Sequence, residues 1–331
     1  MTDQIEDLSP LPFTGMPHLG ESGKGFLLRM AELNGLELYE FHLLLRLDPK
    51  RAIRPQDAPV LARIFDCRAS DFDDLVVHRN YATHYVQRHT FQGHLVTRLY
   101  LFDLRHPKVC PRCIEQYGFA RAAWDFTLYL WCPIHQCLLA EHCTTCGKQL
   151  TWFRPGVATC VCRGRLVDLP ENNDASWQVK VMAIAMTHQD DAGQWAHPAL
   201  PPVCWQVFRA LSALSIDGAM RLIWTLGIPQ DADAGLARSR RRPNCAEAAL
   251  IVERGVDHLL DLLQRVGAGH LGTGARVSLL LKALERMKED GATAGDRQFA
   301  ASIIESLFRP RRSHRPSNDE KQLALALEAR Q

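Results

Sequence analysis

The sequence predicts a mainly α-helical protein that is interrupted near its middle by two small cysteine-rich modules. Two observations support this fold class. Apolar residues recur at helical spacing in both the first hundred and the last hundred and thirty residues. Between them, short Cys/His pairs cluster in a segment of 53 residues that ends at position 162.

The cysteine-rich segment contains four closely spaced pairs of potential metal ligands. In order they spell C-x2-C-x18-C-x2-H and then C-x2-C-x13-C-x-C, and the eight residues are Cys110, Cys113, Cys132, His135, Cys143, Cys146, Cys160 and Cys162. Four soft or borderline ligands satisfy a closed tetrahedral zinc site and leave no open position for a catalytic water. We therefore predict two structural Zn²⁺ ions in two zinc-ribbon or zinc-knuckle modules.

Buried free cysteines and disulfides are the alternative interpretations of this segment. The chain has eleven cysteines, an odd number, and no secretory segment opens it, which favours reduced thiols in a cytoplasmic, bacterial protein. Within the sites, His142 or Cys137 could replace His135. The C-x-C spacing that ends at Cys162 is also tighter than the usual C-x2-C.

Size and charge set broader bounds on the function. The chain has 331 residues, enough for two or three domains, and a formal net charge of +2. Because this charge is close to neutral, DNA binding would require a local basic patch. No apolar run approaches the roughly 18–20 residues that cross a bilayer, so we expect no membrane partner.

The N-terminal part reads as a series of short helices. The pattern predicts one helix from Glu21 to a stop at Asn34-Gly35 and a second over residues 38–47. Asp57 is placed to cap a third helix.

A turn with the sequence CRAS separates this third helix from the next segment. There, Ser70 with Asp73 resembles a capping box that opens a further helix. Two short helices joined by a tight turn predict a helix-turn-helix, with plain helix packing as the alternative. Acidic residues at 71, 73 and 74 disfavour direct phosphate contact by the second helix.

Residues 78–108 combine basic and aromatic side chains. Such a mixture favours a surface that binds nucleic acid or a protein partner, and a solvated connector is the alternative. The predicted contact residues are Arg79, Arg88, Arg98, Arg105 and Lys108.

The last part is helical again. Helices are predicted at 203–213, at 216–226 between a Ser215 cap and a Gly227 stop, and at 245–266, 275–290 and 296–308. We expect an N-terminal helical domain at 1–108, tandem zinc-binding modules at 109–170, a C-terminal helical domain at 171–308 and a basic, disordered tail at 309–331. No carboxylate pair or nucleophile–histidine set stands out, so no catalytic or cofactor-binding residue is predicted and we expect no enzyme.

These motifs together resemble the TniQ/TnsD family of transposon target-selection proteins, and the short chain favours TniQ. The resemblance rests on "CPRC", Trp124 between the ligand pairs, "CPIH" followed by two leucines, "CTTCGKQL", and the opening "GESGKGFLLRMAELNG". It covers roughly residues 10–165. The family more often has a bulkier residue at the position of Gly23.

The resemblance implies a non-catalytic adaptor for target selection. Such proteins recognise a target, as DNA or through a CRISPR effector complex of the Cascade type, and recruit an AAA+ ATPase that loads the transposase. CRISPR-linked relatives act as dimers, so a homodimer is possible. The competing hypothesis is a zinc-binding helix-turn-helix transcriptional regulator. A nuclease or transposase subunit would need a cluster of metal-binding acids that the sequence does not show.

Overall fold

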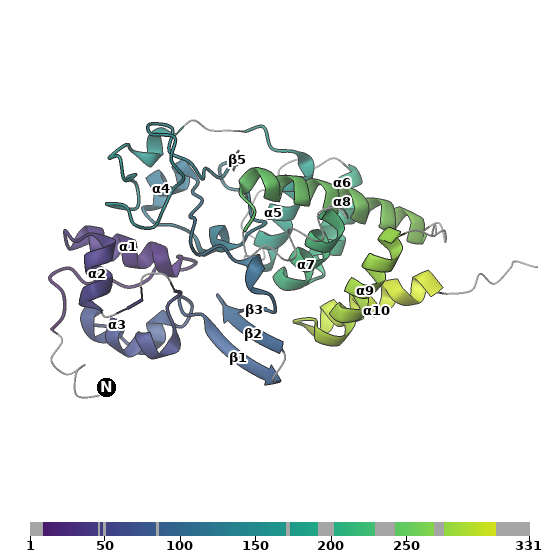
Figure 1. Ribbon diagram of the computed structural model, residues 1–331, viewed down its shortest axis with the longest axis horizontal. Coiled ribbons are helices and arrows are strands. Elements are labelled where there is room, and N and C mark those ends of the chain that lie inside the picture. The colour runs from purple at the N-terminus through teal and green to yellow at the C-terminus, as the bar shows by residue number, and fades with distance from the viewer. Residues whose placement is uncertain are drawn as a thin grey trace, which may run out of the picture.

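A computed structural model describes residues 9–45, 47–48, 51–83, 86–169, 173–190, 202–228, 242–267 and 275–308. The N-terminal helices lie at one end of the molecule and the C-terminal helices at the other (Figure 1). A small sheet lies between them, and part of the cysteine-rich segment lies beside the N-terminal helices (Figure 1). The basic tail predicted after residue 308 and the RSRR stretch before Arg242 fall outside the described residues.

Three helices form the N-terminal end: α1 (Gly23–Leu33), α2 (Leu38–Leu44) and α3 (Ala58–Phe65). Ser22 caps α1, because its side-chain oxygen accepts a hydrogen bond from the Gly25 N–H. The apolar faces of α1 and α3 meet through Phe26 and Phe65, whose ring centroids are 5.1 Å apart.

The second helix of the predicted helix-turn-helix is a single 3₁₀ turn, Ala69–Phe72. The expected capping box also uses other residues: the Asp71 carboxylate, not Asp73, accepts from the backbone N–H three residues earlier, at Arg68. Phe72 is fully buried against Phe26 and Phe65. We infer that anchoring this ring ends the regular structure after one turn.

An antiparallel sheet, absent from the sequence prediction, follows the N-terminal helices. Its strands are β1 (His78–Thr83), β2 (Val86–Phe91) and β3 (His94–Val96), in the order β1-β2-β3. Gln92 and Gly93 both have positive φ, 51° and 72°, as a two-residue type I′ hairpin turn requires. The basic and aromatic segment is therefore largely a hairpin.

The cysteine-rich segment has little regular structure. It contains the short helix α4 (Pro111–Tyr117) and a two-stranded hairpin of β4 (Trp131–Cys132) and β5 (Cys137–Leu138).

The C-terminal end is a set of packed helices, as predicted. They are α5 (Trp177–Asp190), α6 (Pro202–Ser212), α7 (Ile216–Gly227), α8 (Cys245–Gly267), α9 (Ala275–Asp290) and α10 (Ala294–Phe308). The predicted cap of α7 is confirmed, since the Ser215 hydroxyl accepts from the Gly218 N–H at 3.0 Å. Helix α5 was not predicted: Val179 and residues 181–186 are all buried, so the sequence lacks the polar face that marks a surface helix.

A buried polar network joins the sheet to these helices. Asp217 of α7 is fully buried and accepts hydrogen bonds from the backbone and hydroxyl of Thr97, just after β3. Arg221, one turn further along α7, and Arg98 both bind the Asp290 carboxylate of α9 at 2.7 Å. Burial alone would raise the pKa of Asp290. The hydrogen bonds from the two arginines, chiefly from Arg221, hold this pKa below its usual range. The sheet and the C-terminal helices are thus connected through paired charges.

No helix among the described residues is long and apolar enough to cross a membrane.

Candidate metal centres

The first cluster is built by the start of a helix and the turn of a hairpin. Cys110 is the N-cap of α4, and its sulfur accepts from the Cys113 N–H, which holds both thiols on one side of the helix start. Cys132 lies at the end of β4, and the turn that follows it carries His135. The structure therefore brings together four of the predicted ligands, Cys110, Cys113, Cys132 and His135, with ligand atoms all within 4.8 Å of one another.

The distances in this cluster match a tetrahedral ion. Bonds of about 2.3 Å to sulfur and about 2.0–2.1 Å to nitrogen place tetrahedral ligands about 3.8 Å (S···S) and about 3.6 Å (S···N) apart. The Sγ atoms of Cys113 and Cys132 are 3.6 Å apart. His135 Nδ1 lies 3.2, 3.5 and 3.8 Å from the sulfurs of Cys113, Cys110 and Cys132.

A hydrogen bond outside the cluster fixes the histidine ring. His135 Nε2 lies 2.9 Å from Oε1 of Gln116 on α4. Because the amide oxygen can only accept, Nε2 carries the proton and the Nδ1 lone pair faces the three sulfurs. Histidines that bind metals have this arrangement.

The two residues considered as substitutes for His135 have other positions. His142 Nδ1 lies 3.7 Å from the Glu141 carboxylate, away from the cluster. Cys137 is fully buried, and its sulfur is 3.5 Å from Cys110 Sγ. Hydrogen bonds from Cys113, Cys132 and Cys137 keep the pKa of the Cys110 thiol far below its usual range, as suits a thiolate that other thiols surround.

The second cluster is built by two turns. Gly147, at φ 67°, closes the turn after the Cys143–Cys146 pair, where the Gly147 N–H donates to the Cys143 carbonyl at 2.8 Å. The Cys160–Cys162 pair forms a second turn, in which Arg163 has φ 68°. The four sulfurs again lie within 4.8 Å of one another, with 3.7 Å between Cys143 and Cys162 and 3.9 Å between Cys146 and Cys160. None of the eleven cysteines forms a disulfide.

The five basic residues predicted to contact nucleic acid or a partner do not form one patch. In the β1–β2 register Arg79 lies opposite His89 and Arg88 opposite Asn80, so the two arginines occupy opposite faces of the sheet. Arg79 and Arg105 are exposed, whereas Arg88 is half-buried.

Two of the five predicted contacts need correction. The Lys108 ammonium group is buried and donates to the carbonyls of Phe126 and Thr127 at 2.7 and 3.4 Å, so it cannot reach a phosphate on the surface. Burial lowers its pKa. Arg98 is committed to Asp290, as described above, and its role is to join the sheet to α9.

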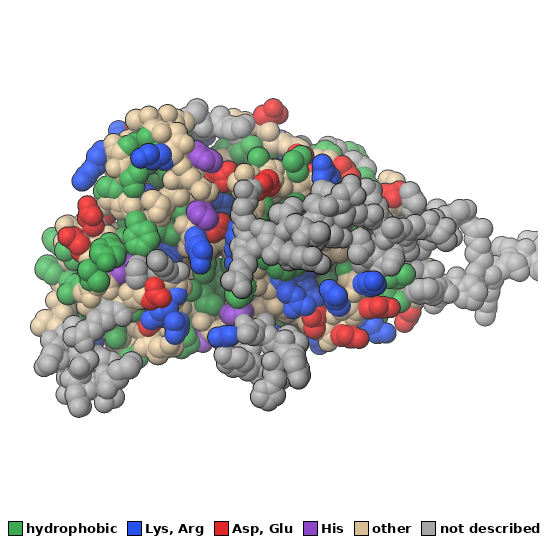
Figure 2. Space-filling view, viewed as in Figure 1, with side chains coloured by type: hydrophobic (Ala, Val, Ile, Leu, Met, Phe, Trp, Pro, Cys, Tyr) green, Lys and Arg blue, Asp and Glu red, His purple; other side chains and the backbone are tan. Residues whose placement is uncertain are grey.

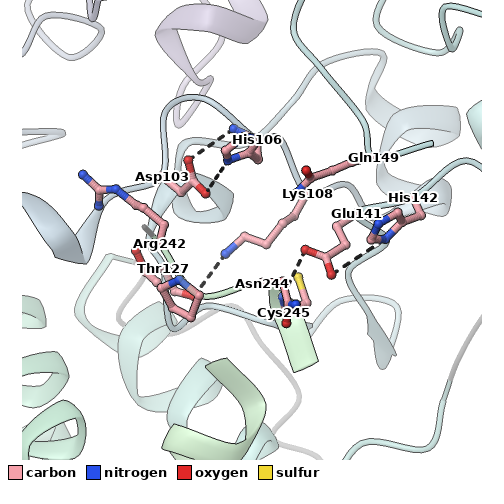
Figure 3. A pocket seen from close by; sticks show the side chains of 11 residues that line it. Asp103, His106, Lys108, Thr127, Glu141, His142, Gln149, Arg242, Asn244 and Cys245 are labelled. Atoms are coloured by element: carbon pink, nitrogen blue, oxygen red, sulfur yellow. Dashed lines mark hydrogen bonds and ion pairs between the residues drawn. The ribbon is translucent and has the colours of Figure 1, made fainter. Parts of the chain in front are cut away.

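A polar cavity of ≈ 350 Å³ lies beside Lys108, between the cysteine-rich segment and the start of α8 (Figure 3). Glu141 accepts from the Cys245 N–H at 3.0 Å, and Asp103 accepts from the ring of His106 at 3.1 Å. Burial raises the pKa of the Cys245 thiol to about 12, against the opposing charge of Lys108. A thiol that remains neutral is a poor nucleophile, so this cavity does not provide an activated cysteine.

Comparison with known protein families identifies the region that contains the first cluster. The TniQ family profile matches residues 12–139. Over these residues the chain is similar to the TniQ family. No curated protein matches the chain. The TniQ match spans the N-terminal helices, the sheet and the whole first cluster, and it ends before Cys143. Proteins of this family are associated with DNA transposition and are generally non-catalytic.

Proposed function

We propose that this protein is a non-catalytic adaptor that makes transposition site-specific. It would link a target, either DNA itself or DNA held by a CRISPR effector complex, to the AAA+ ATPase and transposase of a mobile element. The main support is the TniQ match together with two clusters whose four side chains each leave no coordination position for a substrate.

We propose that both clusters hold Zn²⁺. The support is the donor set: three sulfurs and an imidazole nitrogen in the first cluster and four sulfurs in the second, at separations that suit tetrahedral zinc. Zinc would fix the turns in place and supply no chemistry of its own.

The metal modules would act as rigid spacers in this function. The first cluster is packed into the main core, and the network around Asp217 ties the sheet to α7 and α9. Each end of the molecule could then present its surface to a different partner at a fixed separation. Arg79, Arg88 and Arg105 are the candidates for target contact, and homodimer formation belongs to the same proposal.

Integration reconstituted from purified components tests the adaptor. Without this protein, insertion should lose its preferred site or stop. Insertion at the same site and rate without it would disprove the proposal. A variant with Arg79 and Arg105 changed to Ala should lose site preference while it keeps its metal content, whereas Arg165→Ala, another exposed arginine, should behave like the wild type.

The alternative of a transcriptional regulator predicts tight binding to one DNA sequence by the protein alone. The short 3₁₀ turn in place of a recognition helix and the exposed acids Asp73 and Asp74 support the adaptor instead. Gel shifts at graded salt separate the two functions. Each phosphate neutralised adds a slope of about 0.9 in log affinity against log salt. We expect weak, strongly salt-dependent binding, and tight specific binding near 0.15 M salt would favour the regulator.

A further inference from the structure

A second and larger cavity, of ≈ 490 Å³, lies against the first metal cluster. One wall is the turn of the hairpin that carries Cys132. The other walls come from the segment before α1, the end of the β2–β3 turn, and α5. Its lining is mainly aromatic and apolar and includes Leu19, Tyr117, Ala123, Trp124, Phe126 and Tyr129.

Arg121 lines this cavity without a counter-ion. Its guanidinium lies over the rings of Tyr117 and Phe119, 4.7 and 5.9 Å from their centroids, which fixes its plane. It forms no hydrogen bond or ion pair with any described residue, and its Nε is buried. An arginine that is held in place but left unpaired is suited to bind a carboxylate from another molecule.

Trp124 supplies a second donor without an acceptor. Its side chain is buried, with 2 % of its surface exposed, and its indole N–H has no partner. The indoles of Trp131 and Trp152 also lack acceptors, but neither residue lines the cavity. One cavity thus combines an unpaired indole with an unpaired guanidinium.

The surroundings favour a protein partner over nucleic acid. Leu19 lines the cavity and is 89 % exposed, and Phe13 and Met16 of the same segment are also exposed. Asp74 lines the cavity, is exposed and would repel a chain of phosphates. One carboxylate beside Arg121 suits this charge pattern better than a polyanion does.

We infer that this cavity binds an extended peptide segment of a partner protein, in which a bulky apolar side chain is followed by an acidic one. The apolar side chain enters between the aromatic residues, and the carboxylate pairs with Arg121. A peptide carbonyl accepts from the Trp124 indole. The inference goes beyond the proposed adaptor function and does not depend on it, since a peptide site could serve any partner.

Fluorescein-labelled hexapeptides provide the test. Each has Leu-Asp, Phe-Asp or Trp-Asp at its centre, flanked by Gly and Ser residues. The matched controls have Asn in place of Asp. Anisotropy measures their affinity for the full-length protein. The indole ¹H–¹⁵N resonance of Trp124, assigned with Trp124→Phe, reports whether its N–H gains an acceptor. The resonances of Trp131 and Trp152 are internal controls.

We expect the Asp peptides to bind at least about tenfold more tightly than the Asn peptides and to move only the Trp124 resonance downfield. Arg121→Ala should remove this preference, and Ala123→Trp, which fills the cavity and keeps the charge, should abolish binding. Metal content and circular dichroism check that both variants fold, and Arg165→Ala is the control arginine. The inference is wrong if no Asp peptide moves the Trp124 resonance, or if Arg121→Ala binds the Asp peptides as well as the wild type does. It is also wrong if a dT₁₂ oligonucleotide moves that resonance and the peptides do not.

Discussion

The two clusters each offer four potential metal ligands, three cysteines and a histidine in the first and four cysteines in the second, but they occupy different environments. In the first, the three cysteines are buried at 0–1 % exposure inside the main core, and Gln116 orients the histidine. In the second, Cys162 is exposed and Cys146 is half-buried. The first cluster therefore helps to hold the core together, whereas the second organises a lobe at its edge.

The two modules also differ in how they attach to the N-terminal helices. Beside the first, the Ser22 hydroxyl donates to the fully buried Asp125 carboxylate at 2.7 Å. The second contacts α1 through the exposed Glu32, which accepts from the Val157 N–H at 2.9 Å. A Cβ at Gly156 would overlap this carboxylate, so a larger residue there would displace the flexible Glu32 side chain. The first attachment is buried and sensitive to charge, whereas the second uses a hydrogen bond from Val157 to the exposed Glu32 and a ring contact between His42 and Phe153.

The largest expected effect is that of Cys113→Ser in the first cluster. Structural zinc in small modules contributes on the order of 10–16 kcal/mol, so losing this ion should unfold the core around it. Elemental analysis should give one zinc per chain, and the main thermal transition should fall or disappear. A variant that keeps two ions, or keeps the wild-type transition with one, would contradict the assignment of this cluster to the core.

Cys146→Ser tests the second cluster in the same way and should act locally. We expect one zinc per chain again, but with the main thermal transition retained. Hydrogen exchange should lose protection mainly over residues 143–165, because the lobe lies at the edge of the core. Global unfolding would show that the two modules do not differ as proposed.

Asp125→Asn should change how stability depends on pH. Burial raises the pKa of Asp125 from its usual value of 3.8 to about 7, despite the Ser22 hydrogen bond. The folded state therefore holds a proton that the unfolded state has lost, and the wild type loses stability as pH rises from about 4 to about 7. Relative to the wild type, the variant should gain about 2–3 kcal/mol between pH 5 and pH 8. Urea unfolding at several pH values measures this. Buried His42, whose pKa is lowered to about 4 by burial, adds a pH dependence of opposite sign to both proteins. This contribution cancels when the variant is compared with the wild type.

Gln116→Ala should weaken metal binding at the first cluster alone. Loss of a residue that orients a metal-bound histidine typically costs 10–100-fold in affinity, or about 1.4–2.7 kcal/mol. Competition with a chromophoric chelator should show one weakened site and one unchanged site. His142→Ala is the matched control, and if it weakens the site as much as His135→Ala does, the choice of ligand is wrong.

The smallest expected effect is that of Glu32→Ala at the attachment of the second module. Loss of this hydrogen bond should cost about 0.5–1.5 kcal/mol, the net contribution of a typical hydrogen bond. Both ions should remain bound, and hydrogen exchange at Val157 should become faster. A loss of zinc would show that the contact with α1 supports the cluster itself.

The spacing of the ligands along the chain determined the composition of both clusters, because each pair lies within one tight turn and local geometry aims both ligands at one ion. Local signals also predicted the Ser215 cap and most of the helices. The Gln92-Gly93 turn of the β2–β3 hairpin carries only a glycine as a local signal, because Gln-Gly is not one of the dipeptides that mark such turns. The domain boundaries and the role of Arg79, Arg88 and Arg105 stay predictions.

Only the tertiary structure decided which charges are available to a partner. Arg98 and Lys108 look alike in sequence, yet Asp290, 192 residues from Arg98 along the chain, binds one, and the carbonyls of Phe126 and Thr127 bind the other. The cavity beside Arg121 is likewise assembled from segments that extend from Leu19 to Thr187. Ligand pairs are local and follow from spacing, whereas burial, ion pairing and cavities depend on contacts between distant segments that no local pattern encodes.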